Sequence, residues 1–435
     1  MGGALASLPI REFYFTKENK VGIPTNNRVV NFRSVATILF GIGLFLATAQ
    51  AQTFSVLHYF SNGPDGAYPI GGMYQHGAGA LYGTASGECL SCFGAVFKLA
   101  QKQGSWILTP IFIFKEAASG AFPQGELVAG PDGGLYSTTY LGNGGLDDCG
   151  VVFEVKPGTR APASVLTEWS EDLLHIFGLH GSDGCNPNGG VIFDQAGNVY
   201  GAADGYGNDH QGVVYELSPS GSNWIYTILY TFTDNNAGDS LVGDLIFDSA
   251  GNLYGVSSQG GAYGFGEIYE LSASGSGWTE NVIHSFQNGA DGANPEAGLI
   301  ADNSGNFYGT TSTGGAHQDG TVFMLTAPNG VWTLNTIYAF KGGGSGPYGP
   351  LVMDGAGNLY GTTYGGGAYG NGSVFELTPS NGAWIYTDLH DFSSSGLDGK
   401  NPQGSIVVSA NGTIFGTATN GGQYGYGTAW QITPN

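Results

Sequence analysis

Positive charge is scarce in this chain, which has 12 lysines and arginines against 34 aspartates and glutamates in 435 residues. Nucleic acids and anionic membranes bind clusters of basic side chains, so the composition argues against both as partners. All of this acidic excess lies after residue 51, because the first 51 residues hold more bases than acids. An acidic surface is typical of a soluble extracellular protein and is compatible with neutral glycans or divalent cations as ligands.

Charged residues of both signs make up only 11% of the chain, so side chains that favour helices are few. Glycine is abundant, with 78 residues, and aromatic residues account for 13%. This combination predicts many short strands joined by tight turns. Collagen is excluded because glycine has no three-residue period, and a flexible linker is excluded because 41% of the residues are hydrophobic.

Long apolar runs are missing after residue 51, but one is present near the N-terminus. Arg28 and Arg33 precede an apolar run over residues 35–47, and a small-x-small sequence ends at Ala51. This pattern predicts a signal peptide that is cleaved before Gln52.

The chain therefore divides into an N-terminal leader with the signal peptide, residues 1–51, and one folded domain, residues 52–435. We expect the mature protein to be secreted, periplasmic or on the cell surface, without membrane insertion after cleavage.

Three landmarks recur seven times in the folded domain, with a period of about 54 residues. The first is a Trp-x7-Phe frame, with Gln52 replacing the tryptophan in the first copy, and its phenylalanines are Phe60, Phe114, Phe177, Phe232, Phe286, Phe340 and Phe392. The second is a Leu-Tyr-Gly-Thr-Thr type of strand, whose aromatics are Tyr82, Tyr136, Tyr200, Tyr254, Tyr308, Tyr360 and Phe415. The third is a Val-Phe-Glu-Leu type of strand, whose aromatics are Phe97, Phe153, Tyr215, Tyr269, Phe323, Phe375 and Trp430.

Each repeat is interpreted as four strands. Strand a is the Trp-x7-Phe run, strand b a short apolar run, strand c the second landmark and strand d the third. Four aspartates in the b–c turns, Asp194, Asp248, Asp302 and Asp354, are explained by turn capping, although calcium binding is an alternative.

Antiparallel four-stranded units at this period predict an all-β fold, a seven-bladed β-propeller. The folded domain opens with a lone strand a, residues 53–60, and ends with a strand d, residues 428–433. The ring is therefore expected to close by pairing of these two strands. This meander places the a–b and c–d loops on one face, termed the loop face.

One stretch carries a family resemblance: Gly-Asn-Leu-Tyr-Gly-Thr-Thr-Tyr-Gly-Gly-Gly-Ala-Tyr-Gly-Asn-Gly-Ser-Val-Phe-Glu-Leu-Thr-Pro, residues 357–379. It resembles the Gloeo/Verruco ("GloVer") tandem repeat of exported bacterial proteins. The resemblance extends over residues 53–435 and implies an extracellular location, but it assigns no enzyme activity.

Histidine and aspartate vary together in the first, third, fifth and seventh repeats. Two residues before the phenylalanine of strand a, these repeats carry a histidine, namely His58, His175, His284 and His390. Their a–b loops contain Asp-Gly-x-x-Pro, with the aspartates Asp65, Asp183, Asp291 and Asp398. We expect each histidine to hydrogen-bond its loop aspartate as a structural pair, because residues that vary together usually touch. The alternatives are a catalytic dyad, which lacks an evident nucleophile, and ligand binding by the aspartates.

An aromatic row is predicted in the c–d loops of four repeats, at Tyr263, His317, Tyr369 and Tyr424. Exposed rings are what sugar recognition uses, so these residues are candidate ligand-binding residues. Alternatively, the rings plug the loops down onto the blades.

The four cysteines, Cys89, Cys92, Cys149 and Cys185, all lie in the folded domain, and an even number in an oxidising compartment favours disulfides. We favour Cys149–Cys185 and Cys89–Cys92 among the three connectivities, with a zinc site as the minor alternative.

The sequence thus favours an exported, non-catalytic binding or scaffold module that recognises a glycan or a protein partner on the loop face. We expect a monomer with no cofactor and no metal. One alternative is a propeller hydrolase or lyase acting on polysaccharide, and another is a purely structural cell-surface protein. An enzyme should gather acids, tyrosine, histidine or arginine at one end of the channel, whereas the repeats disperse histidine and aspartate around the ring.

Overall fold

The computed structural model describes residues 52–77, 79–87, 93–115, 119–142, 149–158, 169–178, 183–205, 212–232, 240–275, 277–342 and 346–434. They belong to one compact unit, Gln50–Asn435. Within these ranges the regular structure is β-strand, with no α-helix, and no helix that could cross a membrane.

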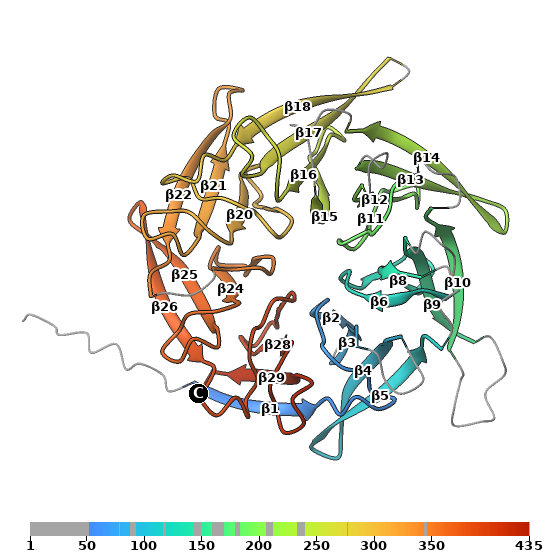
Figure 1. The fold of residues 1–435 in the computed structure, drawn as a ribbon, viewed down its shortest axis with the longest axis vertical. Coiled ribbons are helices and arrows are strands. Elements are labelled where there is room, and N and C mark those ends of the chain that lie inside the picture. Colours follow the sequence, from blue (N-terminus) through green and yellow to red (C-terminus); the bar gives the residue numbers. More distant parts are fainter. Residues whose placement is uncertain are drawn as a thin grey trace, which may run out of the picture. The chain divides into compact units, whose positions relative to one another are not determined.

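Seven antiparallel sheets form a ring and confirm the seven-bladed propeller (Figure 1). The outer strands, corresponding to strand a, are β1 (Thr53–Tyr59), β5 (Ser105–Ile113), β10 (Trp169–Ile176), β14 (Asn223–Thr231), β18 (Gly277–Ser285), β22 (Thr333–Ala339) and β26 (Ala383–Asp391). The inner strands, corresponding to strand b, are β2 (Met73–His76), β7 (Val128–Ala129), β11 (Ile192–Phe193), β15 (Leu241–Phe247), β19 (Ile300–Ala301), β23 (Val352–Met353) and β27 (Val407–Val408).

The two middle strands of each blade match the sequence landmarks. The strands c are β3 (Ala80–Ala85), β8 (Leu135–Leu141), β12 (Val199–Ala203), β16 (Leu253–Ser257), β20 (Phe307–Thr311), β24 (Leu359–Thr363) and β28 (Ile414–Ala418). The strands d are β4 (Ala95–Lys102), β9 (Val151–Pro157), β13 (Val213–Ser220), β17 (Glu267–Ser274), β21 (Thr321–Thr326), β25 (Ser373–Ser380) and β29 (Thr428–Thr433). The second blade differs from the others because a further short strand, β6 (Ala121–Pro123), also pairs with β8.

The glycine of strand c is required by close packing within the blade. A Cβ on Gly309 would lie 2.5 Å from the ring of Phe323, and one on Gly416 would lie 2.3 Å from the ring of Trp430. These strand-d aromatics therefore cover the backbone of strand c, and both Phe323 and Trp430 are fully buried. In the second blade, Ser137 takes the place of the glycine. The repeated Tyr-Gly and the repeated strand-d aromatic are two sides of one contact.

The ring closes as predicted, because β1 pairs with β29 in the sheet that also contains β28 and β27. Phe54 of β1 stands opposite Ile432 and packs against Trp430 of β29. The same ring stacks on His390 of the preceding blade, with ring centroids 3.7 Å apart. The first strand thus completes its own sheet and seals the seam to its neighbour.

The hairpins and turns follow the expected chemistry. Asn381 and Gly382 between β25 and β26 both have positive φ, as the favoured two-residue hairpin requires. In the b–c turn between β11 and β12, the carboxylate of Asp194 accepts hydrogen bonds from two backbone N–H groups, from the amide of Asn198 and from the hydroxyl of Tyr200. The carboxylates of Asp248, Asp302 and Asp354 accept the same set. Turn capping therefore accounts for these aspartates.

Candidate functional site

A cavity of about 640 Å³ opens at the centre of the ring, and segments from all seven blades line it. We call it the channel cavity. Most of its lining comes from the ends of the a–b loops, where the chain enters each inner strand, so it belongs to the loop face. A volume of this size is typical of small-molecule and saccharide sites.

A repeated Pro-x-Gly-x segment brings side chains to the channel cavity. Examples are Pro123-Gln124-Gly125-Glu126 and Pro402-Gln403-Gly404-Ser405. The glycines permit close backbone approach between neighbouring blades, since a Cβ on Gly189 would lie 2.1 Å from the carbonyl oxygen of Gly243. The hydroxyl of Thr138 also donates a 2.6 Å hydrogen bond to the carbonyl of Gly189. The backbone around the opening is thereby fixed, while the x positions are free to vary.

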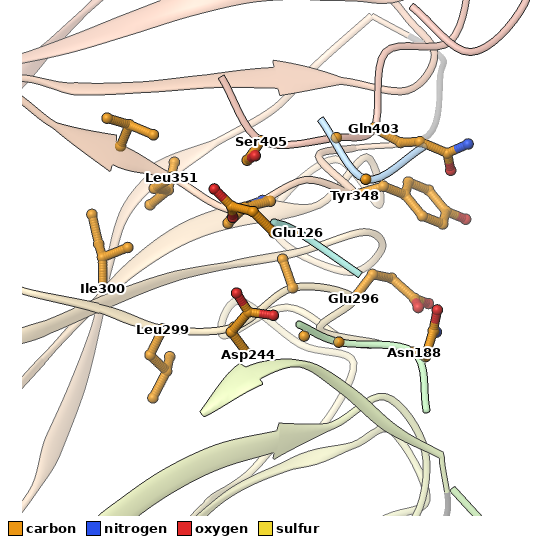
Figure 2. A pocket seen from close by; sticks show the side chains of 18 of the residues that line it. Glu126, Asn188, Asp244, Glu296, Leu299, Ile300, Tyr348, Leu351, Gln403 and Ser405 are labelled. Atoms are coloured by element: carbon orange, nitrogen blue, oxygen red, sulfur yellow. The ribbon is translucent and has the colours of Figure 1, made fainter. Parts of the chain in front are cut away.

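Three carboxyl groups, those of Glu126, Asp244 and Glu296, lie at this cavity (Figure 2). Burial raises the pKa of Glu126 to about 8, and the nearby charge of Asp244 adds to the rise. Burial also raises the pKa of Asp244 to about 6, although the backbone N–H of Gly190 donates to its carboxylate. Burial alone raises the pKa of Glu296 to about 7.

Uncharged polar side chains complete the lining, namely Gln124, Asn188, Tyr348, Gln403 and Ser405. Tyr348 packs against Tyr364 of the same blade, with ring centroids 5.0 Å apart. Within the part of the chain that the structure describes, no lysine, arginine or histidine lines the channel cavity. Amide and hydroxyl groups around a concave opening are suited to hydrogen-bonding a polyol.

The sequence did not reveal this cluster. The paired histidines and aspartates are dispersed around the ring as expected, but Glu126, Asp244 and Glu296 gather at its channel. A signal was present where the chain enters each inner strand. Five repeats carry Pro-x-Gly there, whereas Leu241 replaces the proline in the repeat of Asp244 and Ala297 replaces the glycine in that of Glu296. The other side chains of this segment change from repeat to repeat, which is typical of a binding surface on a repeat fold.

The aromatic row lies on the loop face, and its rings are exposed to solvent. Tyr263, Tyr369 and Tyr424 are 56%, 56% and 53% exposed, and His317 is exposed as well. Backbone hydrogen bonds such as Gly264 N–H to Gly261 and Gly425 N–H to Gly422 fold these loops into tight turns below the rings. The rings therefore do not pack against the blades to hold the loops in place.

All four histidines hydrogen-bond the aspartate of their own loop. The Nε2–Oδ2 distances are 3.0 Å for His58–Asp65, 3.2 Å for His175–Asp183, 3.1 Å for His284–Asp291 and 3.0 Å for His390–Asp398. Each histidine follows a register shift in the outer strand, such as that between Val282 and His284. A bulge re-aims the next side chain, which explains how the imidazole reaches the a–b loop.

The loop aspartates are also held by backbone groups. The carboxylate of Asp291 accepts hydrogen bonds from the N–H groups of Gln287 and Gly289, and that of Asp65 accepts three from Ser61 and Gly63. Although burial opposes it, the hydrogen bonds from His58 and Ser61 lower the pKa of Asp65. Carboxylates engaged in this way stabilise their loops and have little capacity left for a ligand.

We predict that His284→Ala lowers the free energy of unfolding by about 1–2 kcal/mol, because it removes one partner of a part-buried hydrogen bond. Asp291→Ala should cost at least as much, and the double variant should cost less than the two single variants added together. Chemical denaturation of all three proteins measures this coupling. His317→Ala is the matched control, since that histidine is exposed. Unchanged stability of His284→Ala would contradict the structural role.

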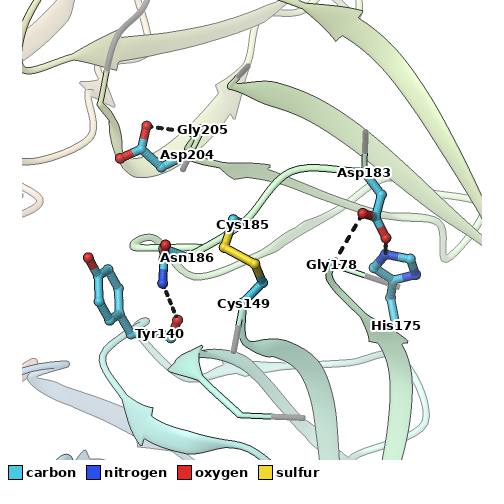
Figure 3. Close-up of a disulfide and its surroundings, with 9 residues drawn as sticks. All are labelled: Tyr140, Cys149, His175, Gly178, Asp183, Cys185, Asn186, Asp204 and Gly205. Atoms are coloured by element: carbon cyan, nitrogen blue, oxygen red, sulfur yellow. Dashed lines mark hydrogen bonds and ion pairs between the residues drawn. A yellow bond between two sulfur atoms is a disulfide. The ribbon is translucent and has the colours of Figure 1, made fainter. Parts of the chain in front are cut away.

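The predicted disulfide Cys149–Cys185 is confirmed, with an S–S distance of 2.02 Å (Figure 3). It joins the c–d loop of the second blade to the following a–b loop, where Asp183 pairs with His175. The backbone N–H of Asn186 donates to the carbonyl of Cys149 beside it. Cys89 and Cys92 lie outside the described residues, so their pairing stays a prediction.

Metal binding has no support in the described part of the chain, where no three or more histidine, cysteine, aspartate or glutamate side chains gather in a suitable group.

Comparison with known proteins identifies the family. The model of the Gloeobacter/Verrucomicrobia repeat matches residues 166–346 and 277–435, so the chain belongs to this repeat family. No curated protein matches the chain.

Solved structures share the fold. An ulvan lyase of a polysaccharide lyase family, bound to -[GlcA(1-4)Rha3S]-, is 10% identical with a TM-score of 0.50, and the match covers 88% of this chain and 95% of that one. A putative 6-phosphogluconolactonase from Bacteroides uniformis is 12% identical with a TM-score of 0.45, covering 74% and 84%. A protein of unknown function from Dyadobacter fermentans is 9% identical with a TM-score of 0.45, covering 88% and 98%. At these identities the likeness concerns the propeller fold alone.

Proposed function

We propose that this protein is an exported, non-catalytic saccharide-binding propeller that holds its ligand on the loop face. The observation that carries the proposal is the aromatic row, in which three tyrosines present more than half of their surface to solvent. Sugar rings pack their C–H groups on such faces, and the channel cavity on the same face offers amides and hydroxyls for orientation. The confirmed disulfide and the repeat family indicate an extracellular location. We further propose that the leader is cleaved before Gln52.

A glycan array probed with residues 52–435 tests the proposal. We expect binding to neutral glycans, and we expect Tyr263→Ala, Tyr369→Ala and Tyr424→Ala each to weaken it by about 2- to 10-fold, the loss of one aromatic contact. Ile385→Ala is the control, because Ile385 is 54% exposed but lies on the outer strand β26. Equal effects of tyrosine and control variants, or no glycan binding, would contradict the proposal.

The enzyme alternative is supported by the carboxyl groups of the channel cavity. A panel of hydrolase and lyase assays on the glycans bound in the array separates it from simple binding. Product formation that Glu126→Gln abolishes would replace the binding proposal with a catalytic one.

A further inference from the structure

We propose that the channel cavity is a subsite for an amino sugar, with the cavity carboxyls pairing with the ammonium group of the saccharide. This inference rests on the proposed saccharide binding and names the class of ligand. It concerns a site distinct from the aromatic row and made of different residues.

The first support is the geometry of the cavity. Glu126 enters from the second blade, Asp244 from the fourth and Glu296 from the fifth, so the carboxyls approach one space from different directions (Figure 2). Gln124, Asn188 and Gln403 also line the cavity, and each directly follows the proline of its segment, as Glu296 does. A saccharide in this space would meet amides and carboxyls at once.

The second support is the sign of the charge. Among the described residues, the cavity lining contains three acids and no base, so its potential is negative whenever any of the acids is ionised. Phosphate, sulfate and uronate groups would be repelled. A protonated amine would be attracted, and charge-assisted hydrogen bonds to carboxylates are among the stronger polar contacts.

The third support is a buried hydroxyl near Asp244, one of the three cavity acids. Tyr215 is fully buried, and its hydroxyl has no hydrogen-bond partner among the described residues. Besides burial, the charge of Asp244 raises the pKa of this phenol, so the two groups lie near each other. A buried hydroxyl without a partner costs about 1–3 kcal/mol, and a polar group brought to Asp244 could relieve that cost.

The raised pKa values supply a signature for this mode of binding. In the empty cavity, protons stay on Glu126 and Glu296 because their pKa values lie near 8 and 7. This protonation lowers the negative charge of the cavity. An ammonium group favours the ionised forms, so binding must release protons. The other titratable groups that face these acids are Asp244, Tyr348 and Tyr215.

Titration calorimetry with a glucosamine tetramer and an N-acetylglucosamine tetramer tests the inference, because acetylation removes only the positive charge. At pH 6, in two buffers of different ionisation enthalpy, we expect the glucosamine tetramer to bind roughly 10-fold more tightly or better. We expect its binding alone to release protons. The double variant Glu126→Gln/Asp244→Asn should bring the two affinities within about 2-fold of each other.

Asp172→Asn is the control for net charge, since Asp172 lies exposed on the outer strand β10. If Asp172→Asn weakens glucosamine binding as much as Glu126→Gln does, the preference arises from overall charge and the inference fails. It also fails if both tetramers bind equally, or if calcium chloride, added alone, gives the binding signal. These results leave tyrosine-dependent glycan binding standing, whereas an array without any bound glycan overturns the proposed function itself.

Discussion

A protein that starts at Ser61, and therefore lacks β1, should lose about 5 kcal/mol or more of its free energy of unfolding, or fail to fold. The deletion removes Phe54 from its contacts with Trp430, Phe392 and His390. It also removes all pairing partners of β29 on that side and leaves an exposed sheet edge, which promotes aggregation. Thermal and chemical denaturation measure the loss.

A circular permutant is the matched control for this deletion. In this permutant, residues 52–60 are attached after the C-terminus. The connection is an Asn-Gly turn copied from the one that joins β25 and β26. This connection makes the closing blade continuous, like the others, and should restore most of the lost stability. If the permutant melts as low as the deletion, pairing of β1 with β29 is not what stabilises the ring.

Replacing both Cys149 and Cys185 by alanine should cost about 4 kcal/mol, because the disulfide closes a loop with a sequence separation of 36 residues. The effect should extend to the channel cavity, since Asn188 lies three residues after Cys185 and lines it. Denaturation with and without reductant, together with glycan binding, checks both parts. The wild type under reducing conditions should approach the variant, and the variant should not respond to reductant. A variant as stable as the oxidised wild type would contradict the prediction.

The architecture was predictable because the same pattern of strand residues recurs in each repeat. Trp-x7-Phe, Tyr-Gly and the strand-d aromatic recur at fixed spacing, and one packing rule, an aromatic ring over a strand glycine, explains the last two. The orphan strands at the two ends of the folded domain predicted the pairing of β1 with β29. The spacing of Cys149 and Cys185 on one face predicted their disulfide.

The channel cavity was harder to predict because its residues follow no repeat of their own. Glu126 and Asp244 stand at one offset in the second and fourth blades and Glu296 at another in the fifth, and only the closure of the ring brings the three together. Their raised pKa values are likewise a property of burial in the assembled ring and not of local sequence. The histidine–aspartate pairs, in contrast, lie within one strand and its loop, where spacing is informative.

The Pro-x-Gly-x entry segments have a consequence for how this fold acquires new specificities. Their backbones are locked to one another by glycine contacts and threonine hydrogen bonds, and the side chains between them line the channel cavity. Single substitutions there can retune the mouth of the ring without redesigning its scaffold. The repeat architecture thus lets the ligand-contacting residues of one blade change while the fold of the ring stays the same.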